Sequence, residues 1–292
     1  MVHLSDSKFA LAIIVPIMVL ELALTAYPIL YSLYTSFTNM NIMTFSSGGT
    51  FIGLANYVEA MNDPLVIEAI GVSLLFTALV LSMSIPMAIG LGLLLNEDFP
   101  GRVIVRCIVL LPWFVSEFIS GVTWRILTHE AYGTFNGILY SLRIIGQYQA
   151  WVKPDTALFM LSIAYVWHYA PFGAFFVLAA LGSINPESYQ AAKIDGAGAF
   201  RRFRSITLPH IRYSLIIVLI LTTMYALTSF DIIYAMTEGG PGTLTQTLTW
   251  LLYREHFANK QYGYAAAVSF VLMILVIVIA SVYFIILRRR RK

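Results

Sequence analysis

The sequence predicts an all-α protein that crosses a membrane six times. Of its 292 residues, 59% are hydrophobic and 11% are charged, whereas a soluble globular domain carries about 25% charged residues. Six segments are also apolar over the length of about 20 residues that a membrane-spanning helix needs. These observations exclude an ordinary water-soluble protein and favour a single membrane domain over residues 1–292.

The predicted spans are separated by more polar stretches. They cover residues 9–34, 69–95, 107–128, 156–182, 213–236 and 263–287. The second, fourth and sixth contain no charged residue, whereas the others each contain one acidic residue: Glu21, Glu117 and Asp231. The first span follows a stretch whose only Lys or Arg is Lys8. Its apolar run is about twice as long as a signal-peptide core, so we expect it to remain as a membrane anchor.

The basic residues predict the orientation of the chain. With a cytoplasmic N-terminus, thirteen of the eighteen lysines and arginines lie in cytoplasmic segments. Cytoplasmic loops are enriched in these residues, so we expect both termini in the cytoplasm. The run from Arg288 to Lys292 directly follows a span and is interpreted as an anchor for anionic membrane lipid. No basic stretch is interleaved with exposed aromatic residues, so nucleic acid is not an expected partner.

Motifs for enzyme chemistry are missing from the sequence. A phosphate-binding loop ends in Gly-Lys-Ser/Thr, and none of the five lysines precedes a serine or threonine. The five histidines include no pair with the spacing of a zinc-binding helix, and no Gly-x-Ser-x-Gly motif occurs. We therefore expect a chain that is not an enzyme and holds neither a metal nor a cofactor. Any ATP hydrolysis then belongs to a partner.

The segment 183–212, between the fourth and fifth spans, is the most patterned loop. Asn185 is expected to cap a short helix that begins at Pro186 and ends at Gly196. A second short helix over 199–207 places three apolar residues on one face, and Pro209 is expected to break it before the fifth span. The sequence thus predicts a helix-turn-helix along the cytoplasmic surface.

This loop has two interpretations, a linker that sets topology or a docking site for a soluble partner. Small residues at its turn favour docking because they let another backbone approach closely; they are Ala191, Ala192, Gly196 and Ala197.

The acidic residues Glu117 and Asp231 also have two interpretations. Acids within spans usually face a cavity or a partner, so each either lines a polar path or pairs with an Arg or Tyr of this or another subunit.

The stretch Gln-Ala-Ala-Lys-Ile-Asp-Gly-Ala at 190–197, followed by Phe203, Ile206, Leu208 and Pro209, resembles the EAA loop of permease subunits of binding-protein-dependent ABC importers. The leading Glu of that family is Gln190 here, which removes a charge but keeps an amide for hydrogen bonding. Other segments resemble carbohydrate permeases, closest to the first permease of maltose, lactose and glycerol-phosphate importers. They are 51–57, Leu111-Pro112, Gly121, Trp124, Gly133, Asn136, Trp167, Pro171-Phe172, 231–234 and 237–242.

The resemblance implies an ATP-driven importer in the cell membrane of a prokaryote that moves a sugar or sugar-like solute inward by alternating access. Its implied partners are a second permease, two cytoplasmic subunits that carry ATP and Mg²⁺, and an extracytoplasmic solute-binding protein. The residues implied to couple to the ATPase are Tyr189, Gln190, Ala191, Ala192, Asp195, Gly196, Ala197, Phe203 and Pro209. Candidates for the sugar path are Glu117, Trp167, Tyr169, Asp231 and Tyr234, with helix packing as the alternative role for the aromatic residues.

The main rival function is an ion- or proton-coupled secondary carrier. Such a carrier is expected to show internal repeats and charged coupling sites, and no convincing repeat is visible. A channel would need rings of like residues from several copies, which one chain does not exclude. Co-purification with an ATPase whose inactivation abolishes uptake separates the importer from both rivals.

Overall fold

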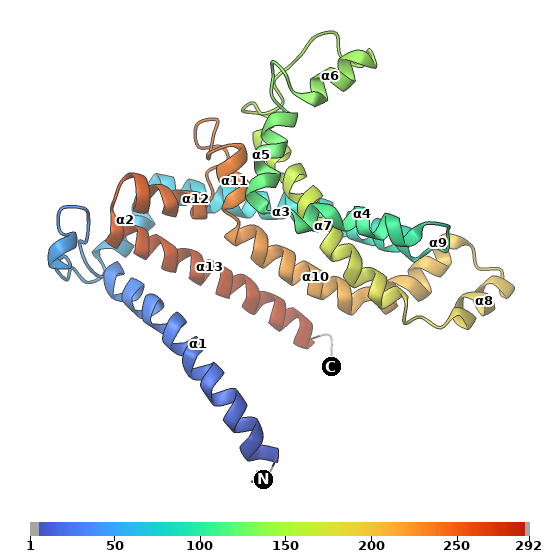
Figure 1. The fold of residues 1–292 in the computed structure, drawn as a ribbon, viewed down its shortest axis with the longest axis horizontal. Helices are drawn as coiled ribbons and strands as arrows, with labels where there is room; N and C mark the ends of the chain where they lie inside the picture. The colour runs from blue at the N-terminus through green and yellow to red at the C-terminus, as the bar shows by residue number, and fades with distance from the viewer. Residues whose placement is uncertain (1–5, 290–292) are drawn as a thin grey trace. The chain divides into compact units, whose positions relative to one another are not determined.

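The computed structural model describes residues 6–289, with side chains from 11 to 285, and this part of the chain is predominantly helical (Figure 1). Within this part of the chain, β-pairing is limited to one isolated antiparallel bridge between Thr38 and Phe51. The elements are α1 (Asp6–Ser36), η1 (Phe45–Ser47), α2 (Ala55–Asn62), α3 (Pro64–Asn96), α4 (Arg102–Phe114), α5 (Glu117–Leu127), α6 (Thr134–Ser141), α7 (Ala157–Leu181), α8 (Pro186–Ile194), α9 (Ala199–Arg202), η2 (Phe203–Thr207), α10 (Leu208–Thr228), α11 (Asp231–Met236), α12 (Leu248–Tyr253), η3 (Arg254–Ala258) and α13 (Tyr262–Arg289).

Five of the described helices are long and apolar enough to cross a membrane. They are Leu11–Ser36, Pro64–Asn96, Ala157–Leu181, Ala199–Thr228 and Tyr262–Ile285. The pair α4 and α5 brings the number to six if it counts as one broken span. A predominantly helical chain with five or six candidate spans is therefore confirmed. The end of the predicted lipid anchor, residues 290–292, lies outside the described residues.

The third predicted span, 107–128, is not one straight helix. Its two parts, α4 and α5, meet at an angle of 95°. Val115 and Ser116 are extended at the junction, with ψ of 145° and 140°. Pro112 lies just before this point, where its missing N–H and its ring weaken the last turn of α4. The bend therefore places Glu117 at the start of a helix rather than in the middle of one.

The fifth predicted span, 213–236, is also placed differently. The helical segment begins at Ala199 and ends at Thr228, so α11 is a separate helix.

The prediction that Pro209 breaks the helix before the fifth span is wrong. A π-helical turn, η2, precedes it, and the Leu208 N–H bonds to the Phe203 carbonyl five residues back. The wider turn carries the backbone into α10 with Pro209 in its first turn, where a missing N–H costs little.

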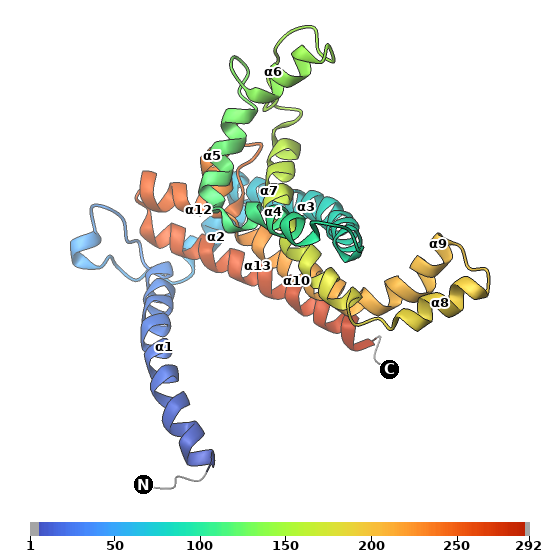
Figure 2. The same ribbon diagram turned by 45° about the vertical axis from the view of Figure 1, so that its right-hand side comes forward.

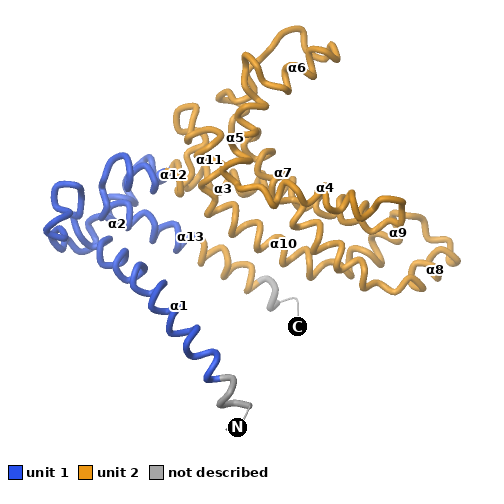
Figure 3. The backbone as a smooth tube through the Cα atoms, viewed as in Figure 1, with its two compact units in different colours: residues 1–67, 251–275 blue, residues 68–250, 276–292 orange. Residues whose placement is uncertain are grey.

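The chain folds as two compact units (Figure 3). The first comprises residues 1–67 and 251–275, and the second comprises residues 68–250 and 276–292. In the second unit, α5 packs against α11 and α7 packs against α4 and α10. Fully buried side chains form its core, among them Phe76, Leu161, Tyr165, Ile232 and Ile233. Tyr169, which belongs to the first site described below, packs against this core.

Candidate functional site

Glu117 is the centre of a hydrogen-bonded cluster in the second unit. Ser229 Oγ donates a short hydrogen bond to Glu117 Oε1, and Tyr169 Oη donates to Glu117 Oε2 at 3.2 Å. Glu117 begins α5, where the helix dipole favours a negative charge. Ser229 follows the last residue of α10. The carboxylate therefore joins the bend between α4 and α5 to the break between α10 and α11.

Aromatic rings extend this cluster. The Tyr169 ring stacks on Tyr165 with centroids 4.5 Å apart and on Tyr225 at 5.7 Å. Tyr165 is fully buried, whereas Tyr225 is 43% exposed. Glu117 and Tyr169 are half-buried. The stack thus runs from the core to the surface and presents one aromatic face and one carboxylate side by side.

A second aromatic group surrounds Tyr234. Its ring stacks on Phe230 at 5.4 Å and lies 5.7 Å from Trp250 and 6.1 Å from Phe118. Asp231, at the start of α11, is exposed. These two candidates therefore lie on α11, next to the Ser229 that binds Glu117.

Trp167 has different surroundings. It is half-buried, lies 6.1 Å from Trp124 in an edge-to-face arrangement, and packs against the core cluster. Of the sequence-predicted path residues, the structure brings Glu117 and Tyr169 into contact, places Asp231 and Tyr234 nearby in the chain, and gives Trp167 a packing contact.

Sequence reasoning missed Ser229, Tyr165, Tyr225 and Phe230. Ser229 carried no signal because the fifth span was expected to continue through it. Tyr165 did carry one, because it is spaced i, i+4 from the candidate Tyr169 and therefore shares a helix face with it.

The helix-turn-helix segment is built from local signals. Asn185 Oδ1 accepts a hydrogen bond from the Glu187 N–H at 2.9 Å, and Pro186 occupies the first turn of α8. At the other end, Gly196 has a φ of +75°. The Ala197 N–H bonds to the Ala192 carbonyl at 2.8 Å and the Gly196 N–H to the Lys193 carbonyl at 3.1 Å. This is a Schellman motif, which ends the helix as the sequence predicted.

One face of this segment packs onto the rest of the second unit. Tyr189 Oη and Thr207 Oγ1 lie 2.9 Å apart in a hydrogen bond. Tyr189 and Ile206 also pack against a buried cluster that includes Val177 and Ile211. In Figures 1 and 2, α8 and α9 lie beyond the joined ends of α7 and α10. The loop is therefore clamped to the two long helices that it connects.

The other face of the segment is open and partly apolar. Ile194 is 87% exposed and Phe200 is 74% exposed. An added Cβ at Gly196 would meet no atom within 4 Å. Among the predicted coupling residues, Gln190, Ala191, Asp195, Gly196 and Pro209 are exposed, and Tyr189, Ala192, Ala197 and Phe203 are half-buried.

Residues 73–292 match the model of a protein family described as the inner membrane component of binding-protein-dependent transport systems. The chain belongs to this family. It is thus a permease subunit of an ABC importer and not an enzyme, since ATP hydrolysis in these transporters lies in separate subunits. The membership decides against the ion- or proton-coupled carrier.

Two relatives match the permease over most of both chains. It is 35% identical to the trehalose/maltose transport system permease protein MalF of Thermococcus litoralis, over 92% of this chain and 90% of that protein. It is 33% identical to the sulfoquinovosyl glycerol transport system permease protein SmoG of Agrobacterium fabrum, over 92% of this chain and 87% of that protein.

Solved structures share the fold of the permease. A bacterial ABC transporter that imports the acidic polysaccharide alginate has a chain that superposes with a TM-score of 0.82, with 24% identity over 98% of this chain and 96% of that one. The alginate transporter in complex with a pentasaccharide-bound periplasmic protein also superposes with a TM-score of 0.82, at 25% identity and with the same coverage.

Proposed function

We propose that the permease moves a sugar or sugar-like solute into the cytoplasm of a prokaryote by alternating access. The observation that carries this proposal is the similarity to two sugar permeases over 92% of the chain, at 35% and 33% identity. The Glu117 cluster supports it chemically. Sugar sites combine aromatic faces with a few placed hydrogen-bonding groups, and Glu117 with Tyr169 and Tyr225 has this composition.

The solute path runs, in this proposal, along the half-exposed side of the Glu117 cluster. Tyr169 and Tyr225 offer ring faces, and Asp231 and Tyr234 extend the path along α11. Glu117 has a double role, because the carboxylate that faces the solute also joins α5 to Ser229. Trp167 contributes by holding α7 in place through Trp124.

The segment 183–212 is, in this proposal, a cytoplasmic docking site for an ATPase subunit, and both chain termini lie on the same side. Ile194 and Phe200 support this assignment because large exposed apolar side chains on a clamped surface mark an interaction site. Gln190 and Asp195 add polar groups on the exposed side. Closure of the ATPase pair would then pull on α7 and α10 together.

Membership of the family supports the remaining partners in this proposal. They are a second, related permease, two ATPase subunits that bind ATP and Mg²⁺, and an extracytoplasmic solute-binding protein. The alginate transporter was solved with its periplasmic protein bound, which supports the last of these. The permease itself is proposed to bind no cofactor.

The docking role is tested by Gly196→Val. A β-branched residue strains the left-handed backbone at φ +75°, so the turn between α8 and α9 should deform. We expect uptake to fall at least tenfold while the complex still hydrolyses ATP. Gly198→Ala is the matched control, because Gly198 has a φ of −64° and open space around it. Equal uptake by both variants would overturn the assignment.

The sugar assignment is tested with the purified complex in proteoliposomes. Uptake of a panel of radiolabelled mono- and disaccharides is measured with the cognate binding protein outside and ATP inside. We expect uptake of at least one saccharide that requires ATP and saturates with the binding protein. Uptake of amino acids or ions but of no saccharide would refute the proposal.

A further inference from the structure

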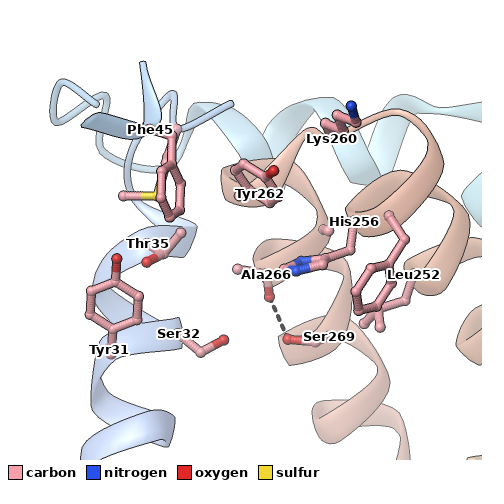
Figure 4. A pocket seen from close by; sticks show the side chains of 13 residues that line it. Tyr31, Ser32, Thr35, Phe45, Leu252, His256, Lys260, Tyr262, Ala266 and Ser269 are labelled. Atoms are coloured by element: carbon pink, nitrogen blue, oxygen red, sulfur yellow. Dashed lines mark hydrogen bonds between the residues drawn. The ribbon is translucent and has the colours of Figure 1, made fainter. Parts of the chain in front are cut away.

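A pocket of about 630 Å³ lies in the first unit, apart from both sites described above (Figure 4). One wall is the end of α1, with Tyr31, Ser32 and Thr35. The opposite wall comes from the segment α12–η3, with His256 among its residues, and from the start of α13, with Tyr262. The pocket therefore lies between the ends of two long apolar helices.

The ends of these helices place the pocket at a membrane boundary. The apolar segment Leu11–Ser36 ends one residue after Thr35, and the segment Tyr262–Ile285 begins at Tyr262. The hydrocarbon core of a bilayer ends where such spans end, and tyrosine is enriched at this depth. A molecule in the pocket would thus have one end among lipid tails and the other among headgroups.

The two walls of the pocket are fixed to one another. The Gly263 N–H donates to the Met40 carbonyl at 2.8 Å. A side chain at Gly263 would collide with the Thr38 carbonyl, 2.1 Å from an added Cβ. Asn56 Nδ2 also donates to the carbonyls of Ser36 and Thr38, both at 2.8 Å. The cavity is therefore preformed and held open by hydrogen bonds to backbone carbonyls.

Lys260 supplies the one charged side chain among the thirteen described residues that line the pocket. Its backbone has a φ of +56°, an uncommon conformation for a residue other than glycine. The Ile42 N–H holds it there through a bond of 3.2 Å to its carbonyl. Strained residues that the surrounding structure holds in place are frequent at functional sites.

The polar groups of the lining suit an acceptor with a negative charge. Thr35 is 5% exposed, and its Oγ1 lacks a hydrogen-bond partner within the described part of the chain. Burial lowers the pKa of His256 below its ordinary value, so this ring is neutral near pH 7. The nearby carboxylate of Glu255 does not line the pocket and already accepts hydrogen bonds from Arg254 and from Asn259 Nδ2.

The rest of the lining is apolar or aromatic. It includes Phe45, Leu252 and Phe257, with the rings of Phe45 and Tyr262 edge to face at 5.5 Å. A free sugar or inorganic anion would leave this surface uncovered. An amphipathic molecule with an apolar chain and an anionic headgroup covers it and also pairs with Lys260.

We propose that this pocket binds an anionic glycerophospholipid, with the phosphate beside Lys260, a headgroup or ester oxygen accepting from Thr35, and the upper part of an acyl chain against Phe45, Leu252 and Phe257. Bound lipid would join the end of α1 to the start of α13. The proposal concerns membrane anchoring and does not depend on the solute that the permease carries.

The test uses the complete transporter complex in detergent, with native mass spectrometry as the readout. Dioleoyl phosphatidylglycerol is added beside an equal amount of dioleoyl phosphatidylethanolamine, and the retained lipid is counted. We expect the unchanged complex to retain the anionic lipid in at least fivefold preference. Lys260→Asn, which removes the charge but suits a left-handed backbone, should abolish this preference. Lys153→Asn, at an exposed lysine outside the pocket, should leave it intact.

A second variant tests the cavity itself. Ser32→Trp fills the pocket without changing its charge, so it should also expel the anionic lipid. Undiminished retention in both Lys260→Asn and Ser32→Trp would overturn the proposal. The proposal also fails if Lys260→Asn separates the permease from its partner subunits while lipid retention stays the same, because the pocket would then be filled by protein.

Discussion

Glu117 and Phe200 lie in the same compact unit, but their surroundings differ in opposite senses: a charged side chain is partly buried and an apolar one is largely exposed. Glu117 is a charged group beside an apolar core, and both of its carboxylate oxygens accept hydrogen bonds from the chain itself. Phe200 is an apolar group that is 74% exposed. An unpaired polar group at membrane depth and a large apolar group in water are both unfavourable. The chain satisfies the first by its own folding and leaves the second exposed, at the site where we propose that an ATPase subunit docks.

Glu117→Ala should produce the largest effect because it breaks the self-contained cluster. Ser229 Oγ and Tyr169 Oη would lose their acceptor, and each donor left unpaired costs about 1 to 3 kcal/mol. We expect a loss of about 3 kcal/mol in stability, measured as a lower midpoint of thermal denaturation of the purified complex. Glu117→Gln keeps one acceptor oxygen and should lose less. An unchanged midpoint for Glu117→Ala would mean that the cluster does not hold the helices together.

Gly121→Ala should have a somewhat smaller effect on the same region. An added Cβ would lie 2.7 Å from Ala235 Cβ and 2.9 Å from the Ile232 carbonyl oxygen. It would therefore push α11 away from α5, and overpacking of this kind costs about 1 to 3 kcal/mol. Gly137→Ala is the control, because its Cβ would meet only Tyr148 Oη, at 3.6 Å. Gly121→Ala should lower the denaturation midpoint, whereas Gly137→Ala should raise it or change it much less.

Phe200→Asp should leave the helical bundle intact and act on association. Its side chain is exposed, so the denaturation midpoint of the isolated permease pair should not change. The retained ATPase should fall about tenfold in co-purification, which corresponds to about 1.4 kcal/mol. Arg201→Asp, at the neighbouring exposed position, serves as a control for charge. Equal losses for both variants would point to electrostatic contact with the loop rather than to an apolar anchor.

Tyr169→Phe should produce the smallest effect. It removes one hydrogen bond to Glu117 but keeps the ring stacked between Tyr165 and Tyr225. Interhelical hydrogen bonds in membrane proteins contribute about 0.6 kcal/mol on average. We expect that loss in stability together with a several-fold increase in the KM of solute uptake. A changed midpoint with an unchanged KM would assign Tyr169 a structural role alone.

Local signals in the sequence predicted the two ends of α8 well. Asn185, Pro186 and Gly196 act through hydrogen bonds to their immediate neighbours, so their effect does not depend on the rest of the fold. The helix breaks were harder to predict. Pro86 and Pro171 lie inside continuous helices, whereas Pro112 lies just before a bend of 95°. A proline shows where a helix is weak, and only packing decides whether it bends there.

The same reason explains the missed parts of the Glu117 cluster. Ser229 becomes a partner of Glu117 only because α10 ends at Thr228 and α11 packs closely against Gly121. The residues around Ser229 indicate neither the end of α10 nor the packing of α11. The lipid pocket was also beyond sequence reasoning, since Thr35 and Lys260 are more than two hundred positions apart in the chain.

The π-helical turn η2 sets the rotational phase between the two regions compared above. Phe200 and Ser229 lie at opposite ends of the continuous helical segment Ala199–Thr228, the second just beyond its last residue. At about 1.5 Å per residue, this rod is about 45 Å long. A π turn accommodates one extra residue, and each residue turns a helix by about 100°. Deleting one residue within Phe203–Thr207 would therefore restore an α-helical turn with little change of phase, whereas deleting one residue within Leu208–Thr228 would turn Phe200 by about 100° relative to Ser229.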